Sequence, residues 1–373
     1  MMKFTQDMGD IAGKTVFLRA DFNVPVKNGV ITDDFRIQKT KHVINFLKQK
    51  GARIIMASHF EGEGGSLAPV AKLLSLEYPI AFIQNYFPDT PTDLHEALKS
   101  GEIVLLENLR IYAEEKGNDE AFAKHLASFA DMYVNEAFAS SHRAHSSIVG
   151  IPKYIPSFAG FVFEEEVKEL SQALHPEHPF VFILGGAKFE TKIPLIEKFF
   201  TLADKVFIGG ALANDFLKAA GISTGTSLLS NTSVDIKKFL TDKLIMPFDV
   251  RVKSGGGSIV KKVSEITETD YIVDVGPETM KSVCPVIGSA KYVLWNGPLG
   301  NYELGFKEST LSLAKCIAES DSMSLVGGGD TVASIAELNL SEKFSFISTG
   351  GGAMLDFLAN ETLPGIKALN KSL

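Results

Sequence analysis

Cysteine and tryptophan are scarce in this chain of 373 residues, which has two cysteines and one tryptophan. Cys284 and Cys316 do not have the spacing of metal-binding cysteines. So few cysteines are typical of a reducing compartment, in which proteins do not use disulfides. We therefore expect both to be ordinary core or surface residues.

Long apolar segments are absent as well. Residues 1–7 contain no apolar stretch of signal-peptide length. No run elsewhere approaches the roughly 18 apolar residues that a membrane-spanning helix needs. We expect a cytoplasmic protein that does not contact a membrane.

The chain has no excess of positive charge, because 37 lysines and arginines face 45 aspartates and glutamates and the net charge is -8. This balance argues against a general nucleic-acid-binding protein, although a local basic cleft remains possible. A hydrophobic fraction of 45% excludes general disorder. The length exceeds what one hydrophobic core usually supports and predicts two domains.

Five short apolar runs in the second half of the chain each end in glycine. Such runs indicate strands buried on both faces, and ligands bind past the carboxyl ends of parallel strands. Glycine there lets the backbone approach a ligand and leaves peptide N–H groups free for phosphate oxygens. One such loop is common in any α/β protein, but five together predict a phosphate-rich ligand. The runs with their glycines are Val181–Gly186, Lys205–Gly210, Tyr292–Gly297, Ser324–Thr331 and Phe344–Gly352.

The first half shows the same alternation of strands and helices, with a helical pattern at residues 36–47. A boundary falls near Ile155-Pro156, and residues 163–174 have the pattern of a connecting helix. The sequence predicts an α/β protein with two doubly wound parallel-sheet domains joined by a helix.

Cationic side chains follow the predicted strands of the first half. Each of four polar segments directly follows a predicted strand: Arg19–Asn23, Ser58-His59, Glu107–Arg110 and Asn135–His145. Arginine forks bind carboxylate or phosphate, so these segments suggest an anion site. A single arginine in such a place is more often solvated or paired, however.

His142 and His145 could equally be a helix cap or a buried hydrogen-bonding pair. No third or fourth ligand at a supporting spacing favours a metal there.

Glycine loops in one half and cations in the other fit a protein that holds a nucleotide on one domain and a small acid on the other. Phosphoryl transfer depends on positioning and charge neutralisation, which such groups supply. Bringing the two ligands together would require the domains to close, which also excludes water.

Eight short motifs occur along the chain. They are Arg19–Pro25, Ile31–Ile37, Leu106–Arg110, His142–Ser147, Gly185–Lys188, Trp295–Gly300, Gly327–Thr331 and Ser348–Ala353. In sequence and in order they resemble the signatures of the phosphoglycerate kinase family, and the resemblance extends along nearly the whole chain.

The resemblance implies reversible phosphoryl transfer from 1,3-bisphosphoglycerate to ADP, giving 3-phosphoglycerate and ATP, with Mg²⁺ bound to the nucleotide, as in glycolysis and gluconeogenesis. It implies two Rossmann-like domains facing each other across a cleft and moving by a hinge. The expected domains are residues 1–158 with a C-terminal return at 360–373, for phosphoglycerate, and residues 159–359, for nucleotide. The second begins with an interdomain helix near 160–174. A monomer that binds no nucleic acid is expected.

Carried over by position, the resemblance assigns substrate binding to Asp21, Asn23, Arg36, His59, Arg110 and Arg143. It assigns catalysis to Arg36, Lys188 and Gly351. Residues 350–352 would open a helix aimed at the transferring phosphate. Nucleotide binding falls to Gly186, Lys188, Lys192, Gly210, Asn296, Pro298, Glu303, Gly328, Gly329, Asp330 and Thr331. Among these, Asp330 would be linked to the magnesium ion.

One loop departs from the family pattern. After Ser58-His59 the family normally continues Leu-Gly-Arg-Pro, and that arginine contacts the substrate phosphate. This chain has Gly62 in its place, between Glu61 and Glu63. Two alternatives to an active kinase therefore remain: a nucleotide-binding homologue that has lost transfer, and a kinase for a different acid.

We predict weaker 3-phosphoglycerate binding but intact phosphoryl transfer, because one charge-assisted contact is worth about 1.5–3 kcal/mol, or about one to two decades in affinity. The variant Gly62→Arg should therefore lower the Michaelis constant for 3-phosphoglycerate in steady-state assays. An unchanged constant would contradict this explanation of the loop.

Overall fold

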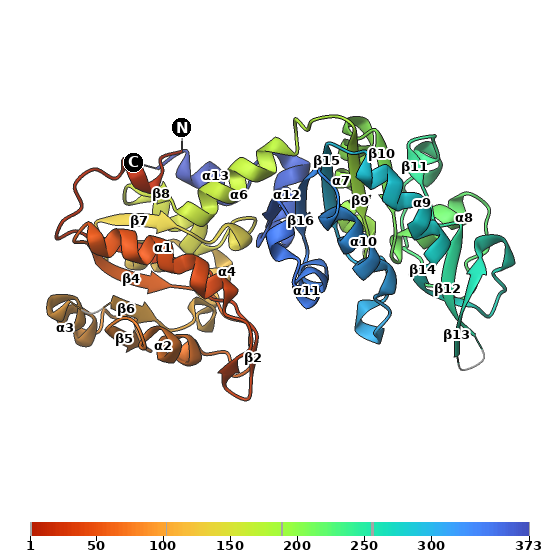
Figure 1. Ribbon diagram of the computed structural model, residues 1–373. Coiled ribbons are helices and arrows are strands. Elements are labelled where there is room, and N and C mark those ends of the chain that lie inside the picture. Colours follow the sequence, from red (N-terminus) through yellow and green to blue (C-terminus); the bar gives the residue numbers. More distant parts are fainter. Residues whose placement is uncertain (1, 102, 188, 255–256, 373) are drawn as a thin grey trace. The chain divides into compact units, whose positions relative to one another are not determined.

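The computed structural model of the protein describes residues 2–101, 103–187, 189–254 and 257–372 (Figure 1). The chain forms two compact units. Unit 1 comprises Met1–Lys168 and Asn360–Leu373, and unit 2 comprises Glu169–Ala359. Each unit is built around its own parallel sheet, which confirms the predicted α/β class.

Unit 1 has a six-stranded sheet in the order β5-β6-β4-β1-β7-β8, in which all neighbouring strands are parallel. β1 and β6 are buried along their whole length, and in β6 the sequence is an unbroken apolar run, as expected for a strand buried on both faces. The strands are β1 (Thr15–Arg19), β4 (Arg53–Ala57), β5 (Ile80–Ile83), β6 (Ile103–Leu106), β7 (Met132–Asn135) and β8 (Ser157–Ala159). A small hairpin, β2 (Val26–Lys27) and β3 (Val30–Ile31), stands apart from this sheet.

Helices cover the sheet of unit 1. In α1 the buried side chains Ile37, Val43, Ile44 and Leu47 recur at the spacing of one helix face. The helices are α1 (Phe35–Gln49), α2 (Ala68–Leu74), α3 (Thr92–Ser100), α4 (Ala113–Gly117), α5 (Glu120–Ala127) and α13 (Pro364–Leu369), together with α6 (Phe161–Gln172), which continues from unit 1 into unit 2 after Lys168. Short helical turns are η1 (Thr5–Asp7), η2 (Leu109–Ile111), η3 (Phe138–Ser140), η4 (Ser146–Gly150) and η5 (Ile151–Lys153).

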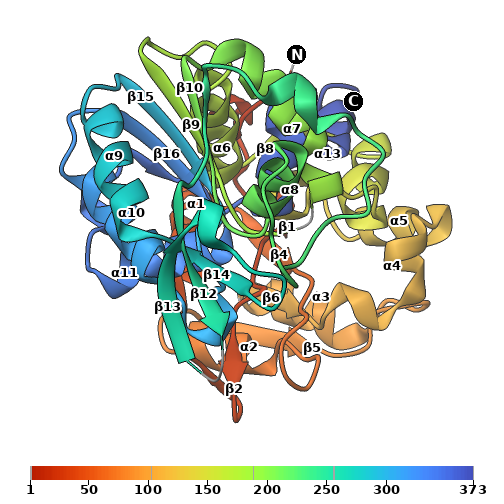
Figure 2. The same cartoon turned by 90° about the vertical axis from the view of Figure 1, so that its right-hand side faces the viewer.

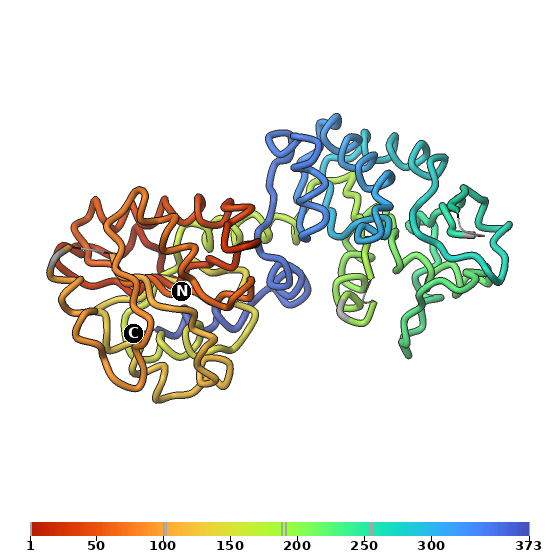
Figure 3. Tube along the Cα trace, turned by 90° about the horizontal axis from the view of Figure 1, so that it is seen from below, coloured from red at the N-terminus to blue at the C-terminus, as the bar shows by residue number. Residues whose placement is uncertain are grey.

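The C-terminal segment belongs to unit 1 although the whole of unit 2 precedes it in sequence. α13 packs against β8 and η4 (Figure 3). The amide of Gly365 donates to the carbonyl of Ser141 over 2.9 Å. Unit 1 is therefore made of two stretches that are distant in the chain.

The main sheet of unit 2 has the order β11-β10-β9-β15-β16-β17 and is also parallel. All five glycine-ended runs form strands of this sheet, as predicted. The strands are β9 (Phe180–Leu184), β10 (Lys205–Ile208), β11 (Leu244–Ile245), β15 (Tyr292–Asn296), β16 (Met323–Gly327) and β17 (Phe346–Ile347).

Unit 2 adds an antiparallel sheet that the sequence analysis did not identify. Its order is β13-β12-β14 (Figure 2). Asp249, Val250 and Val252 of β12 are buried. The strands are β12 (Asp249–Ser254), β13 (Gly257–Lys262) and β14 (Tyr271–Val275).

The helices of unit 2 follow its strands. They are α7 (Phe189–Leu202), α8 (Leu212–Ala219), α9 (Pro277–Gly288), α10 (Glu308–Ala318), α11 (Gly329–Glu337) and α12 (Gly352–Asn360). Short turns are η6 (Ile236–Phe239), η7 (Val263–Glu265), η8 (Tyr302–Leu304) and η9 (Ser341–Lys343). Across the described part of the chain, none of the helices combines the length and apolar character needed to span a bilayer.

The two cysteines are paired, which corrects the expectation that they would be ordinary unpaired residues. Cys284 of α9 and Cys316 of α10 form a disulfide with their Cα atoms 5.5 Å apart. The two helices lie side by side in both side views (Figures 1 and 2), and their contact brings the cysteines together. Sequence spacing alone does not show which helices pack against each other.

We predict that reduction of the disulfide destabilises unit 2. The bond closes a segment with a sequence separation of 32 residues, for which the chain-entropy relation gives about 3–4 kcal/mol. Denaturant unfolding with and without a reductant measures the change. The double variant Cys284→Ser/Cys316→Ser should not respond to the reductant, and equal stability of the wild type in both conditions would contradict the prediction.

Candidate functional site

The predicted anion-binding residues of unit 1 meet at one edge of its sheet. His59 follows β4, Arg110 follows β6 and Arg143 follows β7 after a short turn. Because the strands are parallel, their carboxyl ends lie along the same edge. The backbone topology therefore places these residues at one edge of the sheet, and their binding of an anion stays a prediction.

Arg36 and Asp21 form an ion pair in this group. Nη1 of Arg36 lies 2.8 Å from Oδ2 of Asp21 and 3.4 Å from the carbonyl oxygen of Asn23. Arg36 is the second residue of α1, so the start of this helix sets its position. The Asn23 amide in turn donates to Oδ1 of Asp21 over 3.2 Å.

Arg19 is in a segment that the sequence analysis counted toward the anion site, although it did not assign Arg19 a substrate-binding role. Its side chain is fully buried at the end of β1. Its Nε donates to Ser147 Oγ over 2.8 Å, and Nη1 donates to the carbonyl of Ala20 over 2.6 Å. Ser147 Oγ donates to the buried carboxylate of Glu115 over 2.6 Å. The hydroxyl of Ser147 thus links the buried guanidinium of Arg19 to the carboxylate of Glu115.

His59 lies beside Arg19 and is buried. Its Nδ1 is 3.5 Å from Nη2 of Arg19 and 3.3 Å from Oγ of Ser140. Burial, and then the charges of the surrounding arginines, hold the pKa of His59 well below its usual value. His59 therefore serves as a neutral hydrogen-bonding group at neutral pH.

Arg110 contacts a carboxylate that the sequence analysis had noted only as an added glutamate. Its Nη1 pairs with Oε1 of Glu61. The same carboxylate oxygen is 3.8 Å from Nη1 of the more exposed Arg143. Burial lowers the pKa of Arg110, although Glu61 acts in the opposite direction. Glu61 thus lies against two of the predicted substrate-binding arginines.

The position of the missing arginine is filled by a neighbouring ring. A Cβ atom at Gly62 would lie 2.3 Å from Cζ of Phe60, whose side chain is buried. An arginine at this position would require Phe60 to move. The variant Gly62→Arg consequently tests the loop less cleanly than a change at Glu61.

The two histidines of the first-half motif lie near the arginines without forming a metal centre. Arg143 Nε donates to Nε2 of His142 over 3.3 Å. Nδ1 of His145 is 3.9 Å from Glu115, and burial lowers the pKa of His145 to about 4. Among residues 2–101, 103–187, 189–254 and 257–372, no cluster of three or more metal-ligating side chains occurs.

Five of the predicted nucleotide-binding residues of unit 2 line a cavity of about 280 Å³. It lies past the carboxyl ends of β9, β10 and β15. The predicted residues that line it are Gly186, Gly210, Pro298, Glu303 and Asp330. The cavity is open enough for a small ligand and has the position expected for one in a parallel sheet.

Further predicted residues form the structure behind this cavity. Asn296 Nδ2 donates to the carbonyl of Gly327 over 3.0 Å, and Thr331 Oγ1 accepts the amide of Gly297 over 3.0 Å. Both side chains are buried. They join the loop after β15 to the loop after β16 and so fix the wall of the cavity.

The glycine loops pack on one another, which corrects part of the sequence expectation. The amide of Gly186 donates to the carbonyl of Pro298 over 2.7 Å, and that of Gly210 donates to Leu299 over 3.0 Å. These N–H groups are therefore engaged within the protein. Gly210 has φ +62°, and a Cβ atom there would lie 2.4 Å from the Gly186 nitrogen. Close packing of the loops explains the glycine at this position.

Lys192 is the described lysine of the nucleotide motif, whereas Lys188 lies outside the described residues. Nζ of Lys192 donates to the carbonyl of Gly185 over 2.5 Å. A Cβ at Gly186 would lie 3.2 Å from this nitrogen, so the ammonium group is next to the cavity wall. Burial lowers the pKa of Lys192 to about 8.

Asp330 and the two adjoining glycines begin α11. Gly328 precedes the helix with φ +105°, and Asp330 is exposed at its second residue, at the cavity. An exposed carboxylate at the start of a helix fits the prediction for Asp330, because Mg²⁺ is held in proteins by one or two carboxylates together with substrate phosphates. Amides in the first turn of a helix have no intrahelical partner and favour an anion.

Gly351 lies just before α12, which begins at Gly352. Its φ is +53°, and a Cβ there would have no atom within 4 Å. Space beside the start of a nine-residue helix is compatible with the predicted contact to a phosphate.

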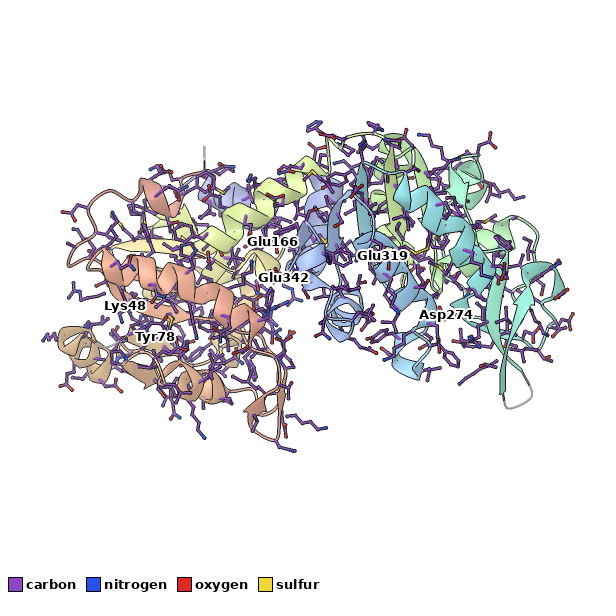
Figure 4. The ribbon with its side chains drawn as sticks, in the orientation of Figure 1. Lys48, Tyr78, Glu166, Asp274, Glu319 and Glu342 are labelled. Atoms are coloured by element: carbon purple, nitrogen blue, oxygen red, sulfur yellow. A yellow bond between two sulfur atoms is a disulfide. The ribbon has the colours of Figure 1, made fainter. Side chains whose placement is uncertain are left out.

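Asp274 is a cavity residue that no sequence motif identified. It lies on β14, in unit 2 (Figure 4), and is buried. Ser309 donates to it through both its hydroxyl and its amide, and burial raises the pKa of Asp274 to about 6. A Cβ at Gly300 would lie 2.4 Å from Oδ1 of Asp274. The side chain thus supports the loop that carries Pro298 and Glu303.

A sequence model described as phosphoglycerate kinase matches residues 5–361 of the chain. The phosphoglycerate kinase of Borrelia garinii subsp. bavariensis is 41% identical over 392 aligned residues, covering 99% of this chain and 100% of the relative. That of Chlorobium phaeobacteroides is 43% identical over 398 residues, with coverage of 99% and 100%.

The fold of the chain is also similar to solved structures of phosphoglycerate kinases. The phosphoglycerate kinase structure from Coxiella burnetii matches with a TM-score of 0.85 and 35% identity, covering 100% of this chain and 99% of the other. The structure from Pyrococcus horikoshii matches with a TM-score of 0.84 and 30% identity, covering 99% and 98%.

We predict that nucleotide affinity falls as the pH rises through about 8, the pKa of Lys192 in the ligand-free protein. Below this pH the ammonium group is charged and attracts phosphate oxygens, and above it the free protein must first take up a proton to bind. The Michaelis constant for ADP should rise several-fold between pH 7 and 9. The rise should vanish in Lys192→Arg, whose guanidinium stays charged. A constant that is flat to pH 9 in the wild type would exclude Lys192 from phosphate binding.

Proposed function

The chain belongs to the phosphoglycerate kinase family of phosphotransferases, and on this premise we propose that it catalyses reversible phosphoryl transfer from 1,3-bisphosphoglycerate to MgADP. The products in this direction are 3-phosphoglycerate and ATP. The observation that supports the proposal best is the presence of two half-sites of matching chemistry. Unit 1 gathers arginines around His59, and unit 2 has a cavity lined by glycine loops and Asp330.

In unit 1 we assign binding of the acid substrate to the predicted residues. Arg110 and Arg143 supply guanidinium groups for its anionic oxygens. His59, which is neutral, and Asn23 supply hydrogen bonds. Asp21 orients Arg36 through their 2.8 Å ion pair, so that Arg36 can face the phosphoryl group during transfer.

In unit 2 we assign nucleotide binding to the cavity. Lys192 would neutralise phosphate charge, Glu303 would accept hydrogen bonds from the ribose, and Asp330 would hold the nucleotide-bound Mg²⁺. This ion, when bound, neutralises charge on the nucleotide phosphate oxygens. The three residues belong to α7, η8 and α11, which are separate elements of unit 2.

The transfer itself needs no covalent enzyme intermediate. An oxygen of the ADP β-phosphate forms a bond to the phosphorus of the acyl phosphate, and the bond from phosphorus to the carboxyl oxygen breaks. The electron pair of that bond leaves with the carboxylate of 3-phosphoglycerate. Charge on the transferring group is spread over three oxygens, so cations and helix-terminal amides stabilise the transition state. The ligands of the two units must meet for this step, so we propose a hinge motion that brings them together and excludes water.

A second candidate function is nucleotide binding with lost or altered acid specificity. The observation that favours it is the Glu61 carboxylate on Arg110, where the family pattern would lead us to expect an added arginine nearby. We retain the kinase as the proposal because Arg36, Arg110, Arg143, Lys192 and Asp330 are all present.

A coupled assay of ATP-dependent 3-phosphoglycerate phosphorylation, with ADP binding measured in parallel, separates the candidates. Turnover supports the kinase. ADP binding without turnover of 3-phosphoglycerate would contradict the kinase and leave the second candidate.

We predict that Arg36→Ala lowers kcat about a hundredfold or more, because a group that stabilises transition-state charge typically contributes a factor of about 10²–10³. Steady-state kinetics with both substrates varied measures this effect. Lys39→Ala is the matched control, since Lys39 lies one turn further along α1 and pairs with Glu165 at 3.3 Å instead. An unaltered kcat in Arg36→Ala would remove Arg36 from a catalytic role.

A further inference from the structure

Glu61 is a carboxylate placed at a cluster of side chains suited to binding an anion from solution. Its Oε1 pairs with Nη1 of Arg110 and lies 3.8 Å from Nη1 of Arg143. Carboxylate and phosphate oxygens make the same kind of charge-assisted bond to a guanidinium. Glu61 therefore occupies the kind of position that an anionic substrate group would take.

The backbone around Glu61 is held in place from two sides. The Glu61 amide donates to Oδ1 of Asn23 over 2.9 Å. Asn108 accepts the amide of Phe60 over 2.9 Å and donates to the carbonyls of Phe60 and Gly65, each over 2.8 Å. Because the loop is fixed before and after Glu61, its side chain can move while the backbone stays.

Asn108 also fixes the partner of Glu61. Its Oδ1 accepts the backbone amide of Arg110 over 3.0 Å. The glutamate and the arginine are thus positioned by the same buried residue, and their contact follows from the local fold.

Arg110 and Glu61 differ greatly in exposure. The Arg110 side chain is 4% exposed, whereas that of Glu61 is 54% exposed. Within the described chain, Nε and Nη2 of Arg110 are buried and have no hydrogen-bond partner. The arginine is therefore short of acceptors, while the glutamate can turn into water, where a carboxylate is well solvated.

We propose that Glu61 is an internal competitor for the acid substrate: its carboxylate holds the anion position at Arg110 and Arg143 and is displaced when the substrate binds. The inference rests on the proposed function, since it takes 3-phosphoglycerate as the ligand. Two anions cannot share this position, so the substrate must first separate Glu61 from Arg110. The glutamate lowers the apparent affinity for the acid by the stability of this pair and leaves the nucleotide half-site unaffected.

The test compares Glu61→Gln with the wild type in binding 3-phosphoglycerate alone, measured by isothermal titration calorimetry without nucleotide. Loss of the charge should tighten binding about two- to fivefold, the range expected for a half-exposed ion pair. The Michaelis constant for 3-phosphoglycerate should fall by the same factor with kcat preserved. Affinity for ADP should not change, and the gain should shrink at high salt because screening weakens the competing pair.

Glu63→Gln is the matched control. Glu63 lies on the same loop and loses the same charge, but its carboxylate accepts the amide of Asn28 over 2.8 Å. Within the described part of the chain it forms no ion pair with the arginines. We expect it to leave 3-phosphoglycerate affinity within error of the wild type.

Three results would overturn the proposal: an unchanged or weaker affinity in Glu61→Gln, an equal gain in Glu63→Gln, or a gain in affinity for ADP as well. A fall in kcat with unchanged affinity would make Glu61 part of the catalytic machinery and would also overturn it. Failure of the proposed function is distinct, because the wild type itself would then neither bind nor turn over 3-phosphoglycerate.

Discussion

Repulsion among arginines at one edge of the unit 1 sheet is the constraint on which the substrate half-site depends. Parallel strands direct their carboxyl ends to this edge, so cations that follow them come close together. Each is balanced differently: Arg19 by the buried Glu115 through Ser147, and Arg36 by Asp21. Arg110 is paired with Glu61, whose side chain is about half exposed at 54%. The charge of Arg19 is neutralised by buried protein groups. At Arg110, in our proposal, an anionic ligand can replace the exposed carboxylate of Glu61.

In unit 2 the backbone of the glycine loops forms part of the cavity wall. Its glycine loops contact one another so closely that a Cβ at Gly210 or Gly297 would lie about 2.5 Å from a backbone atom. The buried side chains of Asn296, Thr331 and Asp274 then hold these loops from behind. The ammonium group of Lys192 lies next to Gly185 and Gly186 at the wall of the cavity. A cavity walled by glycine loops, with Glu303 and Asp330 in its lining, and a separate group of arginines suit the two ligands that a phosphoryl transfer brings together.

Much of the fold could be predicted from the sequence, because apolar runs that form buried strands and glycine-rich turns that follow them are local features of the sequence. The unbroken apolar run of β9 and the helical spacing in α1 correspond directly to structure. Pairings between distant residues could not be predicted. Cys284 meets Cys316 only because α9 packs on α10, and Arg19 meets Ser147 only through the fold. Glu61 was visible as an added charge, but its contact with Arg110 depends on how Asn108 fixes the loop.

The central claim is that the arginine group of unit 1 is an anion site whose internal occupant gives way to the acid substrate. A crystal structure of the protein with 3-phosphoglycerate tests it most directly. The account predicts substrate oxygens within hydrogen-bonding distance of Arg110 and Arg143, with the Glu61 carboxylate turned into solvent. Substrate bound elsewhere, with the pair between Glu61 and Arg110 intact, would contradict it.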